Sequence, residues 1–366
     1  MKWKINCLQL VCLMVFPIIG AVAGIGTHII FKMVNNDGYF CIIFMGLIGF
    51  LYLFMLYYLG NYNHNLSICD VSKDVFGKLF GNIINYVLIA ICIIIALTNM
   101  FSISNFVSSQ YLIRTPLFVV SLLMIIVITI NVCKGFQVVS RVGFIILIIN
   151  LLLFLIAVVG LIPHFKIDNF LPIMNNGVNK IISSSLIISC TNIFPLFILL
   201  SIPFNNLVDK HNIAKSGIIL YSLSIFIVFL VILFTIGVLG KYLIGAYQYP
   251  EYVVLQKISF MNFIDRIENL VAMQWILGAI GYVSLLIYFI TISIKHNSND
   301  KPNPIVAWSS SLVIFILCNL SFKSNTVFNN FVDKVYPYIC FSILPIMILL
   351  TVGAFFKKKR KKLAIK

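Results

Sequence analysis

Charged residues are scarce in this sequence: they make up 10% of its 366 residues, and Asp and Glu together number only 10. A soluble protein normally carries roughly a quarter charged residues. Hydrophobic residues reach 61% and the mean hydropathy is +1.08, which excludes an ordinary water-soluble domain. The chain is therefore predicted to be an integral membrane protein.

The sequence also lacks the motifs of common catalytic and metal sites. It contains no H-E-x-x-H, no P-loop and no G-x-S-x-G motif. None of its 9 cysteines forms a C-x-x-C pair, which argues against a zinc or redox site. Since the apolar runs are nearly free of ionisable residues, we expect no enzyme activity, no catalytic residue, no metal site and no cofactor.

Long apolar runs are what the sequence does contain. A helix needs about 20 apolar residues to cross the bilayer, and the runs are continuous rather than alternating, which favours helices over barrel strands. We predict an all-α fold with about ten transmembrane helices. The expected spans are Leu8 to Phe31, Tyr39 to Leu59, Asn82 to Phe106, Pro116 to Cys133, Val142 to Ile162, Ile181 to Pro203, Gly217 to Leu239, Leu270 to Ile294, Ile305 to Leu320 and Tyr336 to Phe356.

Basic residues predict the orientation, because Lys and Arg accumulate on the cytoplasmic side. With the N-terminus inside, about 17 of the 26 Lys and Arg lie on the cytoplasmic side, so both termini are expected there. The basic run Lys357 to Lys362 opens a cytoplasmic tail, residues 357–366, and is expected to contact anionic lipid rather than nucleic acid. Residues 1–356 are expected to form one transmembrane domain.

The N-terminal segment resembles a cleavable signal peptide, because Lys2 and Lys4 precede an apolar stretch and Ala21-Val22-Ala23. We favour an uncleaved first helix, since the apolar run continues to Phe31 and cleavage would leave an odd number of helices.

Two spans contain residues that interrupt a helix. The first has Pro17 and the stretch Gly20 to Thr27, and the sixth has Ser189 to Pro195. They open two halves, about 8–162 and 181–356, which is the relation expected of an inverted repeat with broken helices 1 and 6. The alternative for the glycines is close helix packing, since Gly20 and Gly24 have small-xxx-small spacing.

Backbone groups freed at such breaks can bind the carboxylate and ammonium of an amino acid. The absence of an acidic residue from these two spans favours a zwitterion over a cation. The other candidate is a modest polar stripe in the third span, where Asn99, Ser102 and Phe106 recur at helical spacing, with ordinary interhelical hydrogen bonding as its alternative. The predicted ligand-binding residues are Gly20, Gly24, Ile25, Gly26, Thr27, Asn99, Ser102, Cys190, Thr191, Asn192 and Phe194.

Several short motifs resemble the endospore germination permeases, the B subunits of nutrient germinant receptors within the amino acid/polyamine/organocation transporter superfamily. Gly24-Ile25-Gly26-Thr27 is similar to the superfamily's unwound G-x-G segment. Arg114-Thr115-Pro116, then Gly135-Phe136-Gln137 and Ser140-Arg141, resemble the family's fourth helix and the turn after it. The strongest likeness is Tyr249-Pro250, Phe263 to Glu268 and Trp275. The chain departs from the family at Phe31, Gln137 and around Phe194.

The resemblance implies a sensor of an amino acid or similar small germinant, located in the spore inner membrane and signalling through partner A and C subunits. The alternative is a secondary amino-acid transporter coupled to protons or sodium. The external loop 241–269 is expected to form a cap with a short amphipathic helix. Gating or structural roles are assigned to His28, Asp265, Arg266, Glu268 and Trp275.

Overall fold

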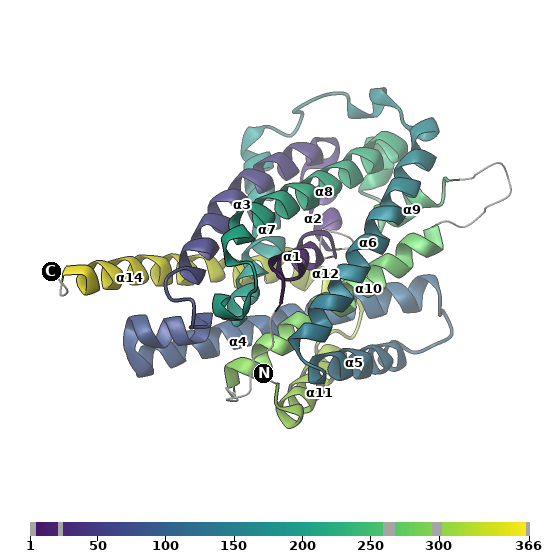
Figure 1. Ribbon diagram of the computed structural model, residues 1–366. Coiled ribbons are helices and arrows are strands. Elements are labelled where there is room, and N and C mark those ends of the chain that lie inside the picture. Colours follow the sequence, from purple (N-terminus) through teal and green to yellow (C-terminus); the bar gives the residue numbers. More distant parts are fainter. Residues whose placement is uncertain (1–4, 21–24, 259–267, 295–301, 364–366) are drawn as a thin grey trace.

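The computed structural model describes residues 5–20, 25–258, 268–294 and 302–363, and they form a bundle of helices (Figure 1). The α-helices are α1 Cys7–Cys12, α2 Thr27–Val34, α3 Gly38–Gly60, α4 Ile68–Gln110, α5 Leu117–Cys133, α6 Phe136–Leu161, α7 Val178–Asn192, α8 Ile213–Ile244, α9 Pro250–Leu255, α10 Glu268–Ile294, α11 Pro304–Ser321, α12 Asn325–Lys334, α13 Tyr336–Phe341 and α14 Ile343–Leu363. Shorter π or 3-10 segments are η1 Phe16–Gly20, η3 Asn35–Asp37, η4 Ile162–His164, η5 Ile167–Phe170, η6 Phe194–Ser201, η7 Phe204–Asn206 and η8 Lys210–Asn212.

Within these described ranges, 8 helical segments are long and apolar enough to cross a membrane. Two shorter apolar segments, Cys7–Gly20 and Leu117–Cys133, belong to the expected first and fourth spans. Every expected span therefore coincides with apolar helix, and the all-α membrane fold is confirmed. The third span differs in length, because α4 begins at Ile68 and bends at Gly77, whose φ of +82° lies in the left-handed region.

The chain ends of the described structure lie on the same side of the bundle. The Ile5 backbone N–H donates to the Asn206 carbonyl, and the Asn205 backbone N–H donates to the His64 carbonyl. These two bonds connect the N-terminal end to the loop after η6, and that loop to the loop after α3. On this side Lys357 of α14 pairs with Asp74 near the start of α4, with 2.9 Å between Nζ and Oδ1. Figure 1 shows these ends of α14 and α4 together at the left of the bundle.

The two halves run in opposite directions through the bundle. The first half comprises the first span, from α1 to α2, and then α3, α4, α5 and α6. The second half comprises α7 with η6, then α8, α10, α11 and α13 with α14. Each half has an odd number of crossings, so the second half begins on the side opposite to the chain ends. This geometry is that of an inverted repeat.

On the side opposite to the chain ends, hydrogen bonds and an ion pair link segments that are distant in the sequence. The Asp37 carboxylate accepts from the backbone amides of Met174 and Asn176 at 2.8 and 3.1 Å. Lys32 of α2 forms an ion pair with Asp333 of α12. The loop after α8 contains the short helix α9, of which Pro250, Glu251, Tyr252 and Val254 are buried.

Candidate functional site

The first span is interrupted near its middle. The segment η1, Phe16–Gly20, is π-helix rather than α-helix, and Ile25 and Gly26 are again π-helical before α2 begins at Thr27, so the described part of the span does not keep the α-helical hydrogen-bond pattern. The Trp275 indole N–H of α10 donates to the Gly20 carbonyl at 3.3 Å. Because lipid offers no donor to a backbone carbonyl outside the regular α-helical pattern, this contact links the π segment to a neighbouring helix.

The second break lies in the span opened by α7. The α-helix ends at Asn192 and the chain continues as the 3-10 helix η6 from Phe194 to Ser201. Pro195 explains the change, since it has no N–H and its ring clashes with the carbonyl four residues earlier. The Tyr52 hydroxyl of α3 donates to the Phe194 carbonyl at 2.7 Å.

A small cavity, here called the break cavity, lies beside the first break and measures about 10 Å³. It has room for about one water molecule. Five predicted site residues line it, and they come from three different spans. Its lining consists of Gly20, Ile25, Asn99, Ser102, Ile103, Phe106, Tyr249, Trp275 and Ala279.

Aromatic rings cover the break cavity on the side opposite to the chain ends. The Phe106 ring packs edge-on against Tyr249, Tyr252 and Trp275, with centroids 5.1, 5.3 and 4.8 Å apart. The Asn105 side-chain amide donates to the Tyr249 hydroxyl at 3.0 Å, which ties α4 to the residue before α9. The break cavity is therefore closed toward that side by α4, α9 and α10.

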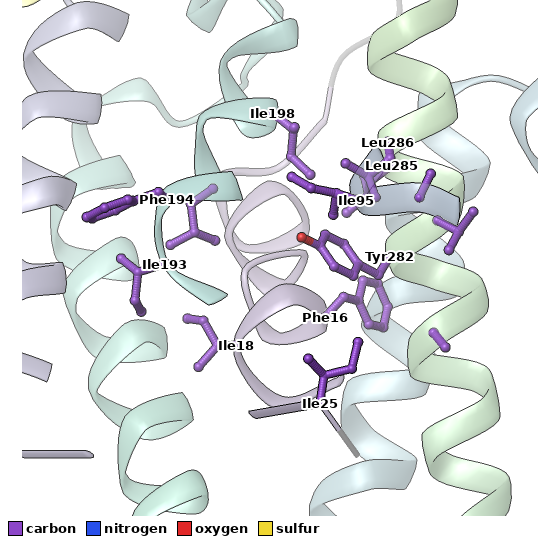
Figure 2. Close-up of a cluster of buried hydrophobic side chains, with 14 of the residues drawn as sticks. Phe16, Ile18, Ile25, Ile95, Ile193, Phe194, Ile198, Tyr282, Leu285 and Leu286 are labelled. Carbon is purple, nitrogen blue, oxygen red and sulfur yellow. The ribbon is translucent and has the colours of Figure 1, made fainter. Parts of the chain in front are cut away.

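The other predicted residues lie away from the lining of the break cavity. Residues Cys190, Thr191, Asn192 and Phe194 are buried in the second broken span. Figure 2 shows the Phe194 side chain on the far side of its helix from Tyr282, while the Ile18 side chain lies between the two broken spans.

Three buried polar atoms near these breaks have no hydrogen-bond partner among the described residues: Thr27 Oγ1, Asn192 Oδ1 and the Tyr282 hydroxyl. Buried polar groups are normally paired, so these atoms are available to a water or a ligand. His28 Nε2 has the same property, while Gly26 is buried directly before α2. Gly24, Asp265 and Arg266 lie outside the described residues, and Glu268 is the first residue of α10.

Several residues of this region were not predicted as site residues. Tyr282 follows Trp275 by two helical turns on α10, so helical spacing was the available signal. Tyr52 lies in a uniformly apolar helix, where the sequence offers no mark of its contact with Phe194. In the described part of the chain, no three His, Cys, Asp or Glu side chains group as metal ligands.

Two broken spans within inverted halves define a multi-pass membrane protein with a transporter fold. A solved manganese transporter from Eremococcus coleocola has the same fold: one variant matches with a TM-score of 0.66 and 13% identity, covering 96% of this chain and 81% of that one. A second variant gives a TM-score of 0.63 at 12% identity. The chain belongs to the spore germination protein family, whose model matches residues 4–327.

Two curated relatives support this assignment. Spore germination protein KB of Bacillus subtilis (strain 168) is 26% identical over 340 residues, which cover 90% of each chain. Spore germination protein XB of Bacillus anthracis is 22% identical over 256 residues, which cover 69% of this chain and 70% of the relative. Family and fold therefore point to a permease or receptor rather than an enzyme.

Proposed function

We propose that this chain is the B subunit of a spore germinant receptor and that it binds a small germinant at the first helix break. The observation that carries the proposal is the break cavity, where Gly20, Asn99, Ser102 and Trp275 meet in a member of the spore germination protein family. The sequence expectation placed the site at these residues, and their meeting in one cavity supports it.

An amino acid is the ligand class that suits this lining. Among the described residues no carboxylate lines the break cavity, which favours a zwitterion over a bare cation. A zwitterion can be bound by backbone groups at the helix break together with the amide and hydroxyl of Asn99 and Ser102. Thr27 is buried and its hydroxyl has no hydrogen-bond partner in the part of the chain that the structure describes, so it is a further polar group of the same span.

Binding requires the site to enlarge, because an amino acid does not fit into about 10 Å³. The ring cluster of Phe106, Tyr249 and Trp275 is the part that has to move, since it covers the cavity. A ligand that fits only the enlarged state shifts the equilibrium toward that state. We propose that A and C subunits detect this shift in the spore inner membrane.

The orientation belongs to the same proposal. Both chain ends are assigned to the cytoplasm, because the side that carries them also carries Lys73, Lys134 and Arg141. There α14 continues as helix to Leu363, so the run Lys357 to Lys362 extends from the last span. These basic residues are assigned to anionic lipid headgroups, with no role for nucleic acid.

Replacement of Gly26 tests the germinant site. We expect Gly26→Phe to abolish the germination response to amino acids while the protein still reaches the membrane, because Gly26 is buried beside the break. Gly245→Phe is the matched control, since a Cβ at Gly245 meets nothing within 4 Å. A normal response from Gly26→Phe at normal membrane abundance would contradict the proposed site.

The second candidate is a secondary amino-acid transporter, favoured by the fold shared with a solved transporter. Both candidates use a mid-membrane site, and they differ in whether solute crosses. Proteoliposomes that contain this chain alone distinguish them. Concentrative uptake of labelled amino acids would favour the transporter, and saturable binding without uptake would favour the receptor subunit.

A further inference from the structure

A second cavity, here called the inner cavity, lies on the side of the chain ends between α1, α3, η6 and α8. Its volume is about 260 Å³, and its lining includes Leu10, Met14, Leu53, Tyr57, Leu199 and Gly217. The α1 helix precedes the first helix break, and η6 follows the end of α7 at the second. The inner cavity therefore borders one half of each broken span.

Packing around the half-span that precedes the first break is uneven. On one face, Cys12 and Val15 belong to a cluster of buried side chains completed by residues of α6 and α8. Leu10 and Met14 line the inner cavity instead. Atoms that border a void lose van der Waals contacts on that side. An apolar occupant of the inner cavity would supply these contacts to the half-span.

The inner cavity opens to the surface at α3 and α8, which lie side by side (Figure 1). Phe54 and Ile218 line it and are 75% and 48% exposed. On α3 the lining extends from Phe50 to Tyr57, roughly 10 Å along a helix that ends at Gly60. Tyrosines near the ends of membrane helices lie at the level of the lipid headgroups. The cavity therefore begins near the headgroups and extends into the hydrocarbon layer.

The size of the inner cavity selects its occupant. A helix with its side chains is about 10–12 Å across, so a length of about 10 Å fills roughly 900 Å³. The inner cavity, at about 260 Å³, is too small for a helix of a partner subunit or of a second copy. It is larger than an engineered apolar cavity of about 150 Å³ that binds benzene, so it accommodates a segment of hydrocarbon chain. Apart from Tyr57, the described residues that line it have apolar side chains.

Basic side chains lie at the headgroup end of the inner cavity. Lys215 is exposed in the first turn of α8, which is the turn before Gly217. Lys210 precedes α8 and donates to the Asn205 side chain at 2.7 Å, and the connection between η7 and α8 carries one carboxylate, Asp209. The amino end of a helix favours negative charge, so Lys215 and the first amides of α8 together suit a phosphate group.

We propose that the inner cavity binds one acyl chain of a phospholipid whose phosphate group lies at Lys215 and the amino end of α8. The bound chain fills the space beside α1 and completes the packing of the half-span that precedes the first helix break. This site is separate from the break cavity and from the basic run Lys357 to Lys362. It does not depend on which germinant the receptor recognises.

Native mass spectrometry tests the site, because it counts the phospholipids that each chain retains. The full-length chain is taken from bilayers of phosphatidylglycerol into a mild detergent and washed. Gly217→Phe places a ring in the cavity, since a Cβ at Gly217 meets nothing within 4 Å. Ile219→Phe, at a side chain 55% exposed on the same helix, is the matched control. We expect Gly217→Phe to retain one phospholipid fewer than the wild type and than Ile219→Phe. Equal retention in all three would overturn the proposal.

Lys215→Gln leaves the cavity open and removes the positive charge, so it gives a result even if Gly217→Phe does not fold. We expect this variant to lose phospholipid at least fivefold faster during washing, whereas Lys134→Gln, at another exposed lysine, should match the wild type. A wild-type rate of loss from Lys215→Gln would overturn the placement of the phosphate. If Gly217→Phe instead displaced a fatty acid, a second copy of the chain or another protein, the proposed occupant would be wrong.

Discussion

At the residue scale, aromatic side chains stabilise both helix breaks through single hydrogen bonds. Trp275 donates to the Gly20 carbonyl and Tyr52 donates to the Phe194 carbonyl. Each donor comes from a helix other than the broken one, so each break is held by tertiary structure. If such a donor were removed, the lipid surroundings would supply no water to replace its hydrogen bond to the carbonyl.

Trp275→Phe removes one of these donors while it retains most of the ring. We expect a loss of about 1 kcal/mol in stability, since hydrogen bonds inside membrane proteins contribute about that much, together with a weaker germination response. The measurement is the unfolding temperature of the purified chain and the germinant concentration for half-maximal response. Trp308→Phe, at a side chain 48% exposed, is the control. A response unaffected by Trp275→Phe would show that the Gly20 contact is dispensable.

The sequence predicted individual residues of the site unevenly. Gly20, Asn99, Ser102 and Trp275 were predicted and line one cavity. Tyr249 belonged to a quoted motif, but its position over the cavity depends on the contact between its hydroxyl and Asn105, 144 positions apart in the chain. Such long-range contacts leave no periodic pattern in a single sequence.

At the scale of elements, the first broken span has differently anchored halves. Before the break, Ile5 forms an isolated β-bridge with Leu207, whereas α2 is linked to α12 by the Lys32–Asp333 ion pair. The halves can therefore respond separately to a ligand at the break. Motion of short helix segments about such positions is a common mode of conformational change.

Charge exchange tests the tie between α2 and α12. The Lys32 side chain is 58% exposed, so the pair should contribute less than about 1 kcal/mol and its loss should shift the half-maximal germinant concentration less than about fivefold. We expect Lys32→Asp and Asp333→Lys each to cause a shift and the double exchange to restore the wild-type value. Additive effects in the double variant would show that the two charges do not act as a pair.

Hydropathy predicted that the spans are helices and where they lie. It did not predict which type of helix forms at each break. The expected sixth span, Ile181 to Pro203, is indeed helical, but only its first part is α-helix and Phe194–Ser201 is 3-10. Pro195 predicts an interruption without specifying which helix type follows it. The site residues expected after Ser189 are accordingly buried in the span and do not line the break cavity.

At the scale of the whole molecule, the order of the spans arranges the site. The inverted halves bring α10, the third span of the second half, against α4, the third span of the first half, and against η1 of the first broken span. Those two helices supply Asn99, Ser102 and Trp275 to the break cavity. The division of about ten crossings into two halves was readable from hydropathy, whereas the face that each helix turns inward required the packed structure.

The central claim is that a small germinant binds in the break cavity, and direct binding tests it most plainly. The measurement is equilibrium binding of a mixture of labelled amino acids to the purified full-length chain in nanodiscs. Ser102→Leu is the site variant and Leu123→Phe, at a side chain 60% exposed on α5, is the control. We predict saturable binding to the wild type and to Leu123→Phe, at least tenfold weaker in Ser102→Leu. Binding of equal affinity in all three would contradict the site.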